Sequence, residues 1–468
     1  MRVAMVGAGY VGLVSGACFA DFGHIVTCVD NDAEKIGALN AGQMPIYEPG
    51  LADLVARNVR DGRLAFSADF GRILGDTDVT FIAAGTPSRR GDGHADLTHV
   101  HAAAREIAKG LAGFSVVVMK STVPVGTGDE VEAILRSARP DLDVAVVSNP
   151  EFLREGAAIR DFKHPDRIVV GLEDARAQDV LAELYRPLSL NVAQILYTGR
   201  RTAELIKYAA NAFLATKITF INEIADLCEK VGADVEDVAR GIGLDNRIGS
   251  KFLHAGPGIG GSCFPKDTLA LNKTAQHESS PLRILEAVVA VNDARKSAMA
   301  DRVATALGGS VRDKTIGILG LTFKPNTDDI RESPSLALIS SLQRMGARIR
   351  AYDPVGMEQA KKIMSNVTFC GDEYDCAEEA EGLVIITEWE QFKALDFTKL
   401  RSCMTNPLVV DLRNIYRPEQ VERFGFSYSG IGRGGLSQEA RLGPKSVEKI
   451  LRLRGENKIE GIQDKRAQ

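Results

Sequence analysis

The sequence predicts an α/β protein in which two domains with parallel sheets flank a helical middle. Short β-rich runs alternate with helical patterns from Met1 to about Val170, and the alternation returns from Lys314. Between these regions the apolar residues recur with helical spacing. A chain of 468 residues exceeds what one hydrophobic core supports, so roughly two to three domains are expected.

Ten β-rich runs are the predicted strands. They lie at 3–6, 25–29, 79–83, 116–119, 144–147 and 168–170 in the first domain, and at 315–319, 348–352, 383–386 and 408–411 in the second. Long helices are predicted at 202–230 and 281–307. We therefore expect domains at residues 1–200, 201–310 and 311–440, followed by a charged tail at 441–468.

The composition, with 45% hydrophobic and 25% charged residues, excludes disordered and fibrous proteins. A net charge of -5 gives no overall attraction to nucleic acid or to an anionic membrane. The sequence contains no run of about 20 apolar residues, so no membrane span is predicted. The apolar N-terminal run imitates a secretory leader, but its glycines and the strand that follows favour a folded turn. Seven scattered cysteines without metal-ligand spacing predict no metal site and a reduced, cytoplasmic chain.

A glycine-rich turn with the spacing of a dinucleotide site follows the first strand. It reads GAGYVG, with Gly7, Gly9 and Gly12, and Asp30 ends the next strand. Gly7 permits the tight turn, Gly9 lets a pyrophosphate approach, and Gly12 allows close helix–strand packing. A carboxylate at position 30 can accept hydrogen bonds from the ribose hydroxyls and repels a 2′-phosphate. NAD is therefore predicted rather than NADP. The alternative is a turn without ligand, in which Asp30 only caps.

Two later strand ends carry polar turns, which contain Thr86 and Thr122. Ligands of open α/β sheets bind beyond the carboxyl ends of the strands, so both threonines are candidate contacts to the nicotinamide half. They are equally well explained as helix caps.

Four glycines crowd Cys263 in the segment GPGIGGSCFPKD. This density indicates close approach of a ligand or of other backbone. A helix N-terminus and Lys266 beside the thiol predict a lowered pKa, and we expect Cys263 to be a nucleophile. The other cysteines are assigned to packing.

Lys207 and Asn211 share one face of the predicted long helix. They suit proton transfer and oxyanion binding, although on spacing alone a solvated stripe is the better interpretation. Glu151 and Glu155 follow a strand of the first domain and border the same crevice. Either could orient a water, or both could belong to an acidic first turn of a helix.

NAD and a nucleophilic thiol together permit a four-electron oxidation. The alcohol becomes an aldehyde, then a thiohemiacetal, a thioester and finally a carboxylate. Two other hypotheses are a two-electron β-hydroxyacid dehydrogenase in which Cys263 is idle, and a catalytically silent NAD-binding or scaffold protein.

The motifs taken together resemble the UDP-glucose/GDP-mannose dehydrogenase family over about residues 1–433. In chain order they are GAGYVG, GTPS, STVP, NPEFLREG, ELIKYAANAF, RIGSKFL, GGSCFPKD, LTFKPNTDDIRES and DLRN. The resemblance implies two Rossmann-like domains with parallel sheets, joined by a central helical domain that forms a homodimer or higher homo-oligomer. It implies NAD-dependent oxidation of UDP-glucose to UDP-glucuronate, for polysaccharide synthesis. KFL and NPEFLREG fit the glucose branch better than the alternatives, GDP-mannose or another nucleotide sugar.

The resemblance also implies roles for single residues. Cys263 is the covalent nucleophile; the partners in proton transfer, oxyanion binding and water positioning are Lys207, Asn211, Asp267, Glu151 and Thr122. The cofactor contacts are Gly7, Gly9, Tyr10, Val11, Gly12, Asp30, Lys35, Thr86, Thr122, Glu155, Lys266 and Arg331. The sugar-nucleotide contacts are Glu151, Phe152, Leu153, Arg154, Glu155, Lys207, Asn211, Arg247, Lys251, Phe252, Leu253, Gly260, Phe323, Lys324 and Arg413. Arg247 is expected to reach the site of a neighbouring subunit.

Overall fold

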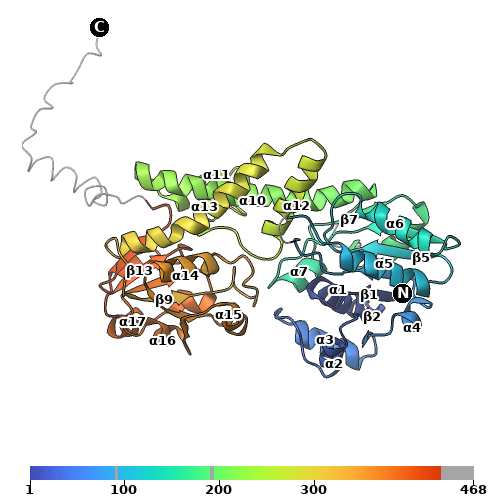
Figure 1. Ribbon diagram of the computed structural model, residues 1–468, viewed down its shortest axis with the longest axis horizontal. Helices are drawn as coiled ribbons and strands as arrows, with labels where there is room; N and C mark the ends of the chain where they lie inside the picture. Colours follow the sequence, from blue (N-terminus) through green and yellow to red (C-terminus); the bar gives the residue numbers. More distant parts are fainter. Residues whose placement is uncertain (90–92, 190–193, 434–468) are drawn as a thin grey trace, which may run out of the picture.

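The predicted α/β fold class is confirmed. The computed structural model describes residues 1–89, 93–189 and 194–433, so the tail expected at 441–468 lies outside the described residues. Two α/β lobes lie side by side, and long central helices run across both of them (Figure 1).

The first lobe is built on a mixed sheet. Its described strands have the order β3-β2-β1-β4-β5-β6-β7-β8. They are β1 (Arg2–Val6), β2 (Ile25–Val29), β3 (Leu64–Ser67), β4 (Val79–Ile82), β5 (Ser115–Met119), β6 (Val144–Ser148), β7 (Arg167–Leu172) and β8 (Gln194–Thr198). Strands β1 to β6 are parallel, whereas β7 pairs antiparallel with β6 and parallel with β8. The sequence did not reveal this reversal, because a buried strand has the same apolar pattern in either direction.

Helices cover both faces of this sheet. They are α1 (Tyr10–Asp21), α2 (Ala33–Asn40), α3 (Leu51–Arg60), α4 (Phe70–Leu74), α5 (Thr98–Gly110), α6 (Thr127–Ala138), α7 (Ala158–Lys163), α8 (Ala175–Leu184) and α9 (Arg186–Ser189). One core gathers around Phe19, which contacts the rings of Phe81 and Phe162. The opposite core contains Ile107 of α5 and Leu135 of α6.

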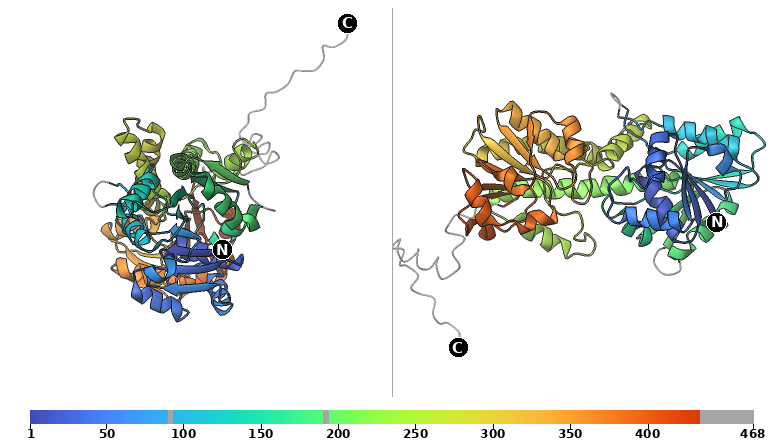
Figure 2. Two further views of the ribbon diagram at one scale, coloured as in Figure 1. Left: turned by 90° about the vertical axis from the view of Figure 1, so that its right-hand side faces the viewer. Right: turned by 90° about the horizontal axis from the view of Figure 1, so that it is seen from below.

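The middle of the chain is helical, as predicted. It contains α10 (Arg200–Val231), α11 (Val235–Gly243), α12 (Phe264–His277) and α13 (Arg283–Ala306). Helix α10 has 32 residues without Pro or Gly and ends at Gly232, which adopts the left-handed conformation typical of a C-cap. Figure 2 shows α10 extending from one lobe to the other.

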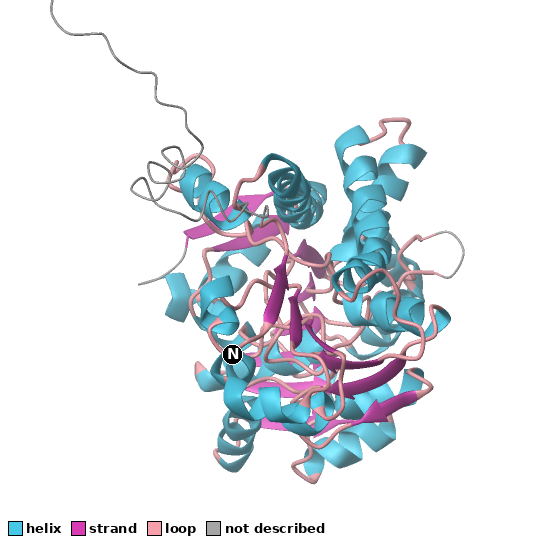
Figure 3. Ribbon diagram, turned by 90° about the vertical axis from the view of Figure 1, so that its left-hand side faces the viewer, coloured by secondary structure: helices cyan, strands magenta, loops and turns pink. Residues whose placement is uncertain are grey.

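The second lobe has a parallel sheet with the order β11-β10-β9-β12-β13-β14 in its described residues. The strands are β9 (Thr315–Leu319), β10 (Arg348–Tyr352), β11 (Val367–Phe369), β12 (Gly382–Ile385), β13 (Leu408–Asp411) and β14 (Ser427–Gly430). The helices are α14 (Pro334–Arg344), α15 (Met357–Ile363), α16 (Glu373–Ala377), the short 3₁₀ helix η1 (Glu390–Ala394), α17 (Phe397–Cys403) and α18 (Pro418–Glu422). Figure 3 shows helices bordering the strands in this lobe.

The four strands that the sequence did not predict are β3, β8, β11 and β14. These are the edges of the two described sheets, and each has exposed or partly exposed positions. A strand paired on one side only does not need a continuous apolar run, so its pattern is weak.

No helix in the described parts of the chain is long and apolar enough to cross a membrane. Cys18, Cys28, Cys228, Cys370 and Cys376 are buried, as expected of packing residues. Cys403 is only partly buried, because it lies in the last turn of the surface helix α17.

Candidate active site

The glycine turn between β1 and α1 combines tight packing with open space. Gly7 has a φ of +105°, and a Cβ there would lie 2.6 Å from the Ala83 carbonyl oxygen. A Cβ on Gly12 would lie 1.8 Å from the Gly7 carbonyl oxygen. At Gly9, in contrast, a Cβ would meet no protein atom within 4 Å. Gly9 therefore faces space that a ligand can fill, directly before the N-terminus of α1.

Asp30 ends β2 beside this turn. Its carboxylate accepts hydrogen bonds from the Ala8 amide at 2.8 Å, the Asp32 amide at 3.0 Å and Lys35 Nζ at 3.0 Å. Burial raises the pKa of Asp30, but these hydrogen bonds outweigh burial and the pKa is lowered. The side chain is therefore an anion at the place where a ribose would lie.

A cavity of about 690 Å³ leads from the glycine turn to Cys263. Of the predicted cofactor residues, its wall contains Gly9, Tyr10, Val11, Thr86, Thr122, Glu155, Lys266 and Arg331. The predicted residues Glu151, Leu153 and Cys263 also line it. The open face of Gly9, the N-terminus of α1 without a side-chain cap and the anionic Asp30 fit a dinucleotide with an unphosphorylated ribose.

A buried cluster of polar side chains surrounds the end of this cavity. Lys207 Nζ of α10 forms an ion pair with Glu151 Oε1 at 3.1 Å, and Asn211 Nδ2 donates to Asp267 Oδ2 of α12 at 2.7 Å. All four residues are buried. The predicted face of α10 thus lies against α12, and the solvated interpretation of Lys207 is wrong.

Lys207 is held as a cation. Burial lowers its pKa. The negative charges of Glu151 and Asp267 and the nearby Cys263 raise it by more, so the net shift of the pKa is upward. In the resting site Lys207 is therefore a hydrogen-bond donor.

Cys263 is the N-cap residue of α12, and its Sγ lies 3.5 Å from Ser262 Oγ. Its pKa is raised to about 11 by burial and by the carboxylates of Glu151 and Asp267, which outweigh Lys207 and Ser262. This reverses the lowered pKa expected from the sequence. The local cation Lys266 is engaged by Asp267 at 2.8 Å, and the decisive carboxylate, Glu151, comes from a distant segment.

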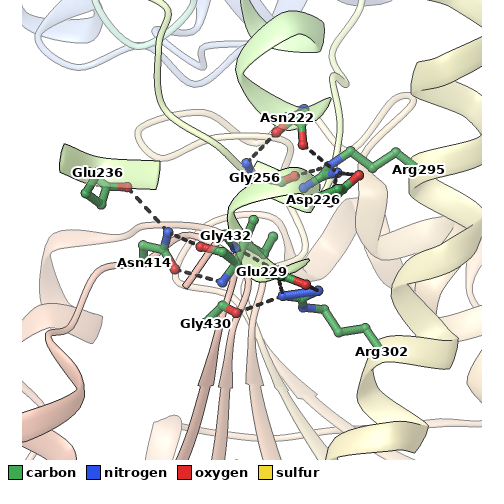
Figure 4. Close-up of polar contacts among 11 residues, drawn as sticks. Asn222, Asp226, Glu229, Glu236, Gly256, Arg295, Arg302, Asn414, Gly430 and Gly432 are labelled. Carbon is green, nitrogen blue, oxygen red and sulfur yellow. Dashed lines mark hydrogen bonds and ion pairs between the residues drawn. The ribbon is translucent and has the colours of Figure 1, made fainter. Parts of the chain in front are cut away.

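Side chains of α10 and α13 hold the glycine-rich loop before Cys263. Gly256 donates its N–H to Asn222 Oδ1 at 2.8 Å and accepts from Arg295 Nε at 2.7 Å (Figure 4). Asn292 Oδ1 accepts from the Ile259 amide at 2.7 Å. Asn222, Asn292 and Arg295 were not predicted from the sequence. Asn292, Arg295 and the neighbouring Lys296 recur at helical spacing on a buried face, which is a detectable pattern.

Glu48 was also missed. It accepts hydrogen bonds from the Tyr10 hydroxyl, the Gly156 amide at 2.6 Å and the Ala158 amide at 2.8 Å. The cofactor turn is thereby linked to the segment that follows Glu151. No periodic pattern surrounds Glu48, so the sequence alone offers no sign of this role.

Glu155 connects three parts of the chain. Its carboxylate accepts from Ser262 Oγ at 3.0 Å and Thr327 Oγ1 at 3.3 Å, and it lies 3.7 Å from Arg331. Burial and Asp329 raise its pKa to about 7. The second lobe therefore reaches the cofactor cavity through this carboxylate.

Only some of the predicted sugar-nucleotide residues lie near one another in the structure. The Phe152 ring lies 3.6 Å from the Arg167 guanidinium and 5.3 Å from Lys207 Nζ. Lys324 Nζ lies 5.2 Å from the Phe323 ring, and burial lowers the pKa of this lysine. These side chains approach the site from opposite lobes.

Other predicted contacts lie at the border of the cysteine loop. Arg413 donates to the Phe323 carbonyl at 3.0 Å, and a Cβ on Gly256 would lie 3.0 Å from its guanidinium. A Cβ on Gly260 would lie 2.6 Å from the Glu332 carbonyl. Leu253 is buried, and Phe252 packs 6.2 Å from the Phe264 ring.

Three other predicted sugar-nucleotide residues do not line the cavity either. Lys251 is exposed, Arg154 is paired with Asp161 at 2.6 Å, and Arg247 is paired with Asp245 while its side chain is 89% exposed.

The fold and the site define a dinucleotide-dependent oxidoreductase with a thiol at the end of its cofactor cavity. Three domain profiles of the UDP-glucose/GDP-mannose dehydrogenase family match the chain: the NAD binding domain at residues 1–189, the central domain at 201–294 and the UDP binding domain at 317–418. The chain belongs to this family.

Named relatives match nearly the whole chain. A UDP-glucose 6-dehydrogenase of Rhizobium meliloti (strain 1021) is 65% identical over 435 residues, covering 92% of this chain and 100% of that protein. One from Bacillus subtilis (strain 168) is 47% identical and covers 92% of this chain and 93% of that protein. The structure of a UDP-glucose dehydrogenase from Pyrobaculum islandicum superposes with a TM-score of 0.85 at 39% identity, covering 93% of this chain and 98% of that one.

Proposed function

We propose that this protein catalyses the NAD-dependent, four-electron oxidation of UDP-glucose to UDP-glucuronate, with Cys263 as the covalent nucleophile. The observation that carries the proposal is the cluster of Lys207, Glu151, Asn211 and Asp267 around a thiol at the end of the cofactor cavity. The named relatives support UDP-glucose as the substrate.

The first oxidation removes a hydride from C6 of the sugar and a proton from its hydroxyl. When bound, NAD accepts the hydride in each oxidation, and two NAD are consumed per sugar. The proton passes to a carboxylate of the cluster, for which Asp267 is well placed beside Asn211. Lys207, a cation in the resting site, donates to the C6 oxygen as negative charge develops there.

The second half is covalent. Cys263 Sγ bonds to the aldehyde carbon, the thiol proton leaves to a nearby carboxylate, and the C6 oxygen takes up a proton to give a thiohemiacetal. Loss of the remaining C6 hydride and the hydroxyl proton gives a thioester. A water positioned by Glu151 and Thr122 then attacks the acyl carbon, the C–S bond breaks, and Cys263 regains its proton.

The second lobe supplies cations for the UDP diphosphate. Lys324 and Arg413 border the cysteine loop, and charge-assisted hydrogen bonds from such residues suit a diphosphate. Arg331 reaches the cavity wall, where it serves the cofactor. Phe152 to Glu155, Lys251 to Leu253 and Gly260 form the remaining sugar-side contacts of this proposal.

The protein is proposed to act as a homodimer through α10. Phe213, Phe220 and Leu227 are spaced by seven residues and are 67%, 50% and 54% exposed, so they form an apolar stripe on one face of the helix. A second copy of α10 would cover this stripe. We propose that the exposed Arg247 then exchanges its pairing with Asp245 for contacts in the partner's site. A cytoplasmic location is proposed because all seven cysteines are free thiols.

The test is the yield of NADH from a panel of UDP-glucose, GDP-mannose, UDP-N-acetylmannosamine and UDP-galactose. Two NADH per UDP-glucose and little from the others is the expected result. A yield of one NADH would support a two-electron dehydrogenase, and none would support a silent NAD-binding protein. Cys263→Ser is expected to bind both ligands without completing turnover, and an unimpaired rate would exclude the thioester route.

A further inference from the structure

A buried lysine that the proposed mechanism does not use lies behind the site. Lys120 follows β5 and is 5% exposed. Its Nζ donates to Asn149 Oδ1 at 3.1 Å and to the Tyr185 hydroxyl at 3.2 Å. The ring centroids of Phe162 and Tyr185 lie 6.0 and 5.8 Å from the ammonium. Among the described residues, Lys120 has neutral neighbours at contact distance and no carboxylate at ion-pair distance.

The hydrogen-bond directions in this network are determined. Tyr185 has a single hydroxyl proton, which it donates to Asn149 Oδ1 at 2.5 Å, so its oxygen accepts from Lys120. Asn149 Nδ2 donates to the Val169 carbonyl of β7 at 2.7 Å. Both the oxygen and the nitrogen of the Asn149 carboxamide are thus held by hydrogen bonds. Asn149 follows β6, the strand with which β7 pairs antiparallel.

Asn149 begins the segment that carries Glu151. It is separated from Glu151 only by Pro150, whose restricted φ limits the backbone conformations between the two residues. Glu151 Oε1 contacts Lys207 at 3.1 Å, and Glu151 Oε2 accepts from the Leu153 amide at 2.5 Å. Lys120 itself lies two residues before Thr122.

The charge of Lys120 also acts on the site. Burial lowers its pKa to about 8; the negative charge of Glu151 opposes this shift and the positive charge of Lys207 adds to it. The Lys120 ammonium and the Glu151 carboxylate therefore attract each other. A buried cation with neutral partners costs stability, and an apolar side chain of similar length would cost less. Packing alone therefore gives no reason for a lysine here.

We propose that Lys120 is a positioning residue of the reaction, which holds Asn149 and thereby the Glu151 carboxylate against Lys207. This inference rests on the proposed function, because Glu151 is taken to position the hydrolytic water. It adds to that function a buried cation outside the cavity wall.

The test compares Lys120→Met with Lys109→Met, which replaces an exposed lysine of α5. Wild-type protein is first checked for two NADH per UDP-glucose, so that failure of the proposed function is recognised separately. Lys120→Met is expected to keep its circular dichroism and to unfold at or above the wild-type midpoint, with KM values near wild type. Its kcat is expected to fall about tenfold, the equivalent of one lost charge-assisted hydrogen bond. Lys109→Met should match the wild type.

A further readout separates positioning from mere packing. An adduct on Cys263 should accumulate in the intact mass of Lys120→Met during turnover, because hydrolysis is the slowed step. A folded Lys120→Met with wild-type kcat and no accumulated adduct would overturn the proposal.

If the Met variant does not fold, Tyr185→Phe carries the test. It retains the cation and removes the hydroxyl that orders Lys120 and Asn149. We expect kcat to fall a few-fold. A kcat equal to that of the wild type would overturn the proposal.

Discussion

Burial and two carboxylates keep Cys263 protonated in the free protein at neutral pH, since its pKa is raised to about 11. A protonated thiol reacts slowly with oxidants and alkylating agents, because the thiolate is the nucleophile. In the proposed mechanism, the same carboxylates take up the proton when Cys263 attacks an aldehyde. The site therefore protects the thiol before substrate binds and provides for its deprotonation afterwards.

Alkylation of Cys263 by iodoacetamide should accordingly be slow at about pH 8 and rise toward about pH 11. A raised pKa means a smaller thiolate fraction at a given pH, which sets this sign. Glu151→Gln removes a negative neighbour and leaves Lys207 with more uncompensated charge, so the pKa should fall and alkylation at about pH 8 should accelerate. The rate is followed by the mass of the peptide that contains Cys263, with Cys263→Ser as the blank. A midpoint at or below about 8.5, the value of an ordinary cysteine, would contradict this account.

Replacement of Asp30 by Asn should change the choice of cofactor. The variant loses the anion that accepts from Lys35 and repels a 2′-phosphate, and Lys35 becomes available to that phosphate. We expect kcat/KM with NAD to fall about tenfold and activity with NADP to appear. The control is Asp32→Asn, a neighbouring acid that caps α2. An unchanged ratio of NAD to NADP activity would show that Asp30 does not select the cofactor.

At the residue scale, spacing alone could predict that Lys207 and Asn211 share a helix face. It could not predict that this face is buried, because burial depends on the packing of α12 against α10. The prediction of a lowered pKa for Cys263 was wrong for a related reason. The sequence shows the local Lys266 but not Glu151, which the fold brings from the end of β6.

At the scale of elements, the glycine turn and α1 form a unit in which two glycines act differently. Ala at position 9 would project into open space, whereas Ala at position 12 would collide with the Gly7 carbonyl. Gly9→Ala should retain stability within about 1 kcal/mol and raise the KM for NAD. Gly12→Ala should lose about 1–3 kcal/mol of stability as well as NAD affinity. Urea unfolding and NAD titration of both variants check this, and equal loss of stability in the two would contradict it.

Interior elements were predictable from the sequence and edge elements were not. The buried strand β5 is a continuous apolar run, and α10 has a long uninterrupted helical period. The edge strands β8 and β14 lack such runs, because one side of each lies against no further strand. The information that places them is in their pairing partners rather than in their own residues.

At the scale of the whole molecule, the apolar stripe of α10 should determine the oligomeric state. Phe220→Asp should convert a dimer to a monomer, measured by light scattering after gel filtration, and should reduce activity because Arg247 no longer reaches a second site. The control is Ile363→Asp, an exposed apolar residue of α15 in the second lobe. A wild-type monomer, or a Phe220→Asp dimer, would contradict the proposed interface.

The order of the domains was readable from the sequence, but the way in which they meet was not. Glu155, Ser262, Thr327 and Arg331 come from three separate segments and meet at one carboxylate. No periodicity predicts such a contact, because each member is an ordinary polar loop residue in its own segment.

Helix α10 also fixes the rotation of one lobe relative to the other about the helix axis. Lys207 pairs with Glu151 in the buried cluster near Cys263. Glu229, farther along the same helix, accepts from the Gly432 amide at 2.7 Å and pairs with Arg302 (Figure 4). The two side chains are about six turns apart and so project from nearly the same side of a helix about 48 Å long. One residue inserted between them would rotate one contact by about 100° relative to the other. The helix therefore tolerates exchange of surface residues far better than any change in its length, because its residue count sets the angle at which one nucleotide domain faces the other.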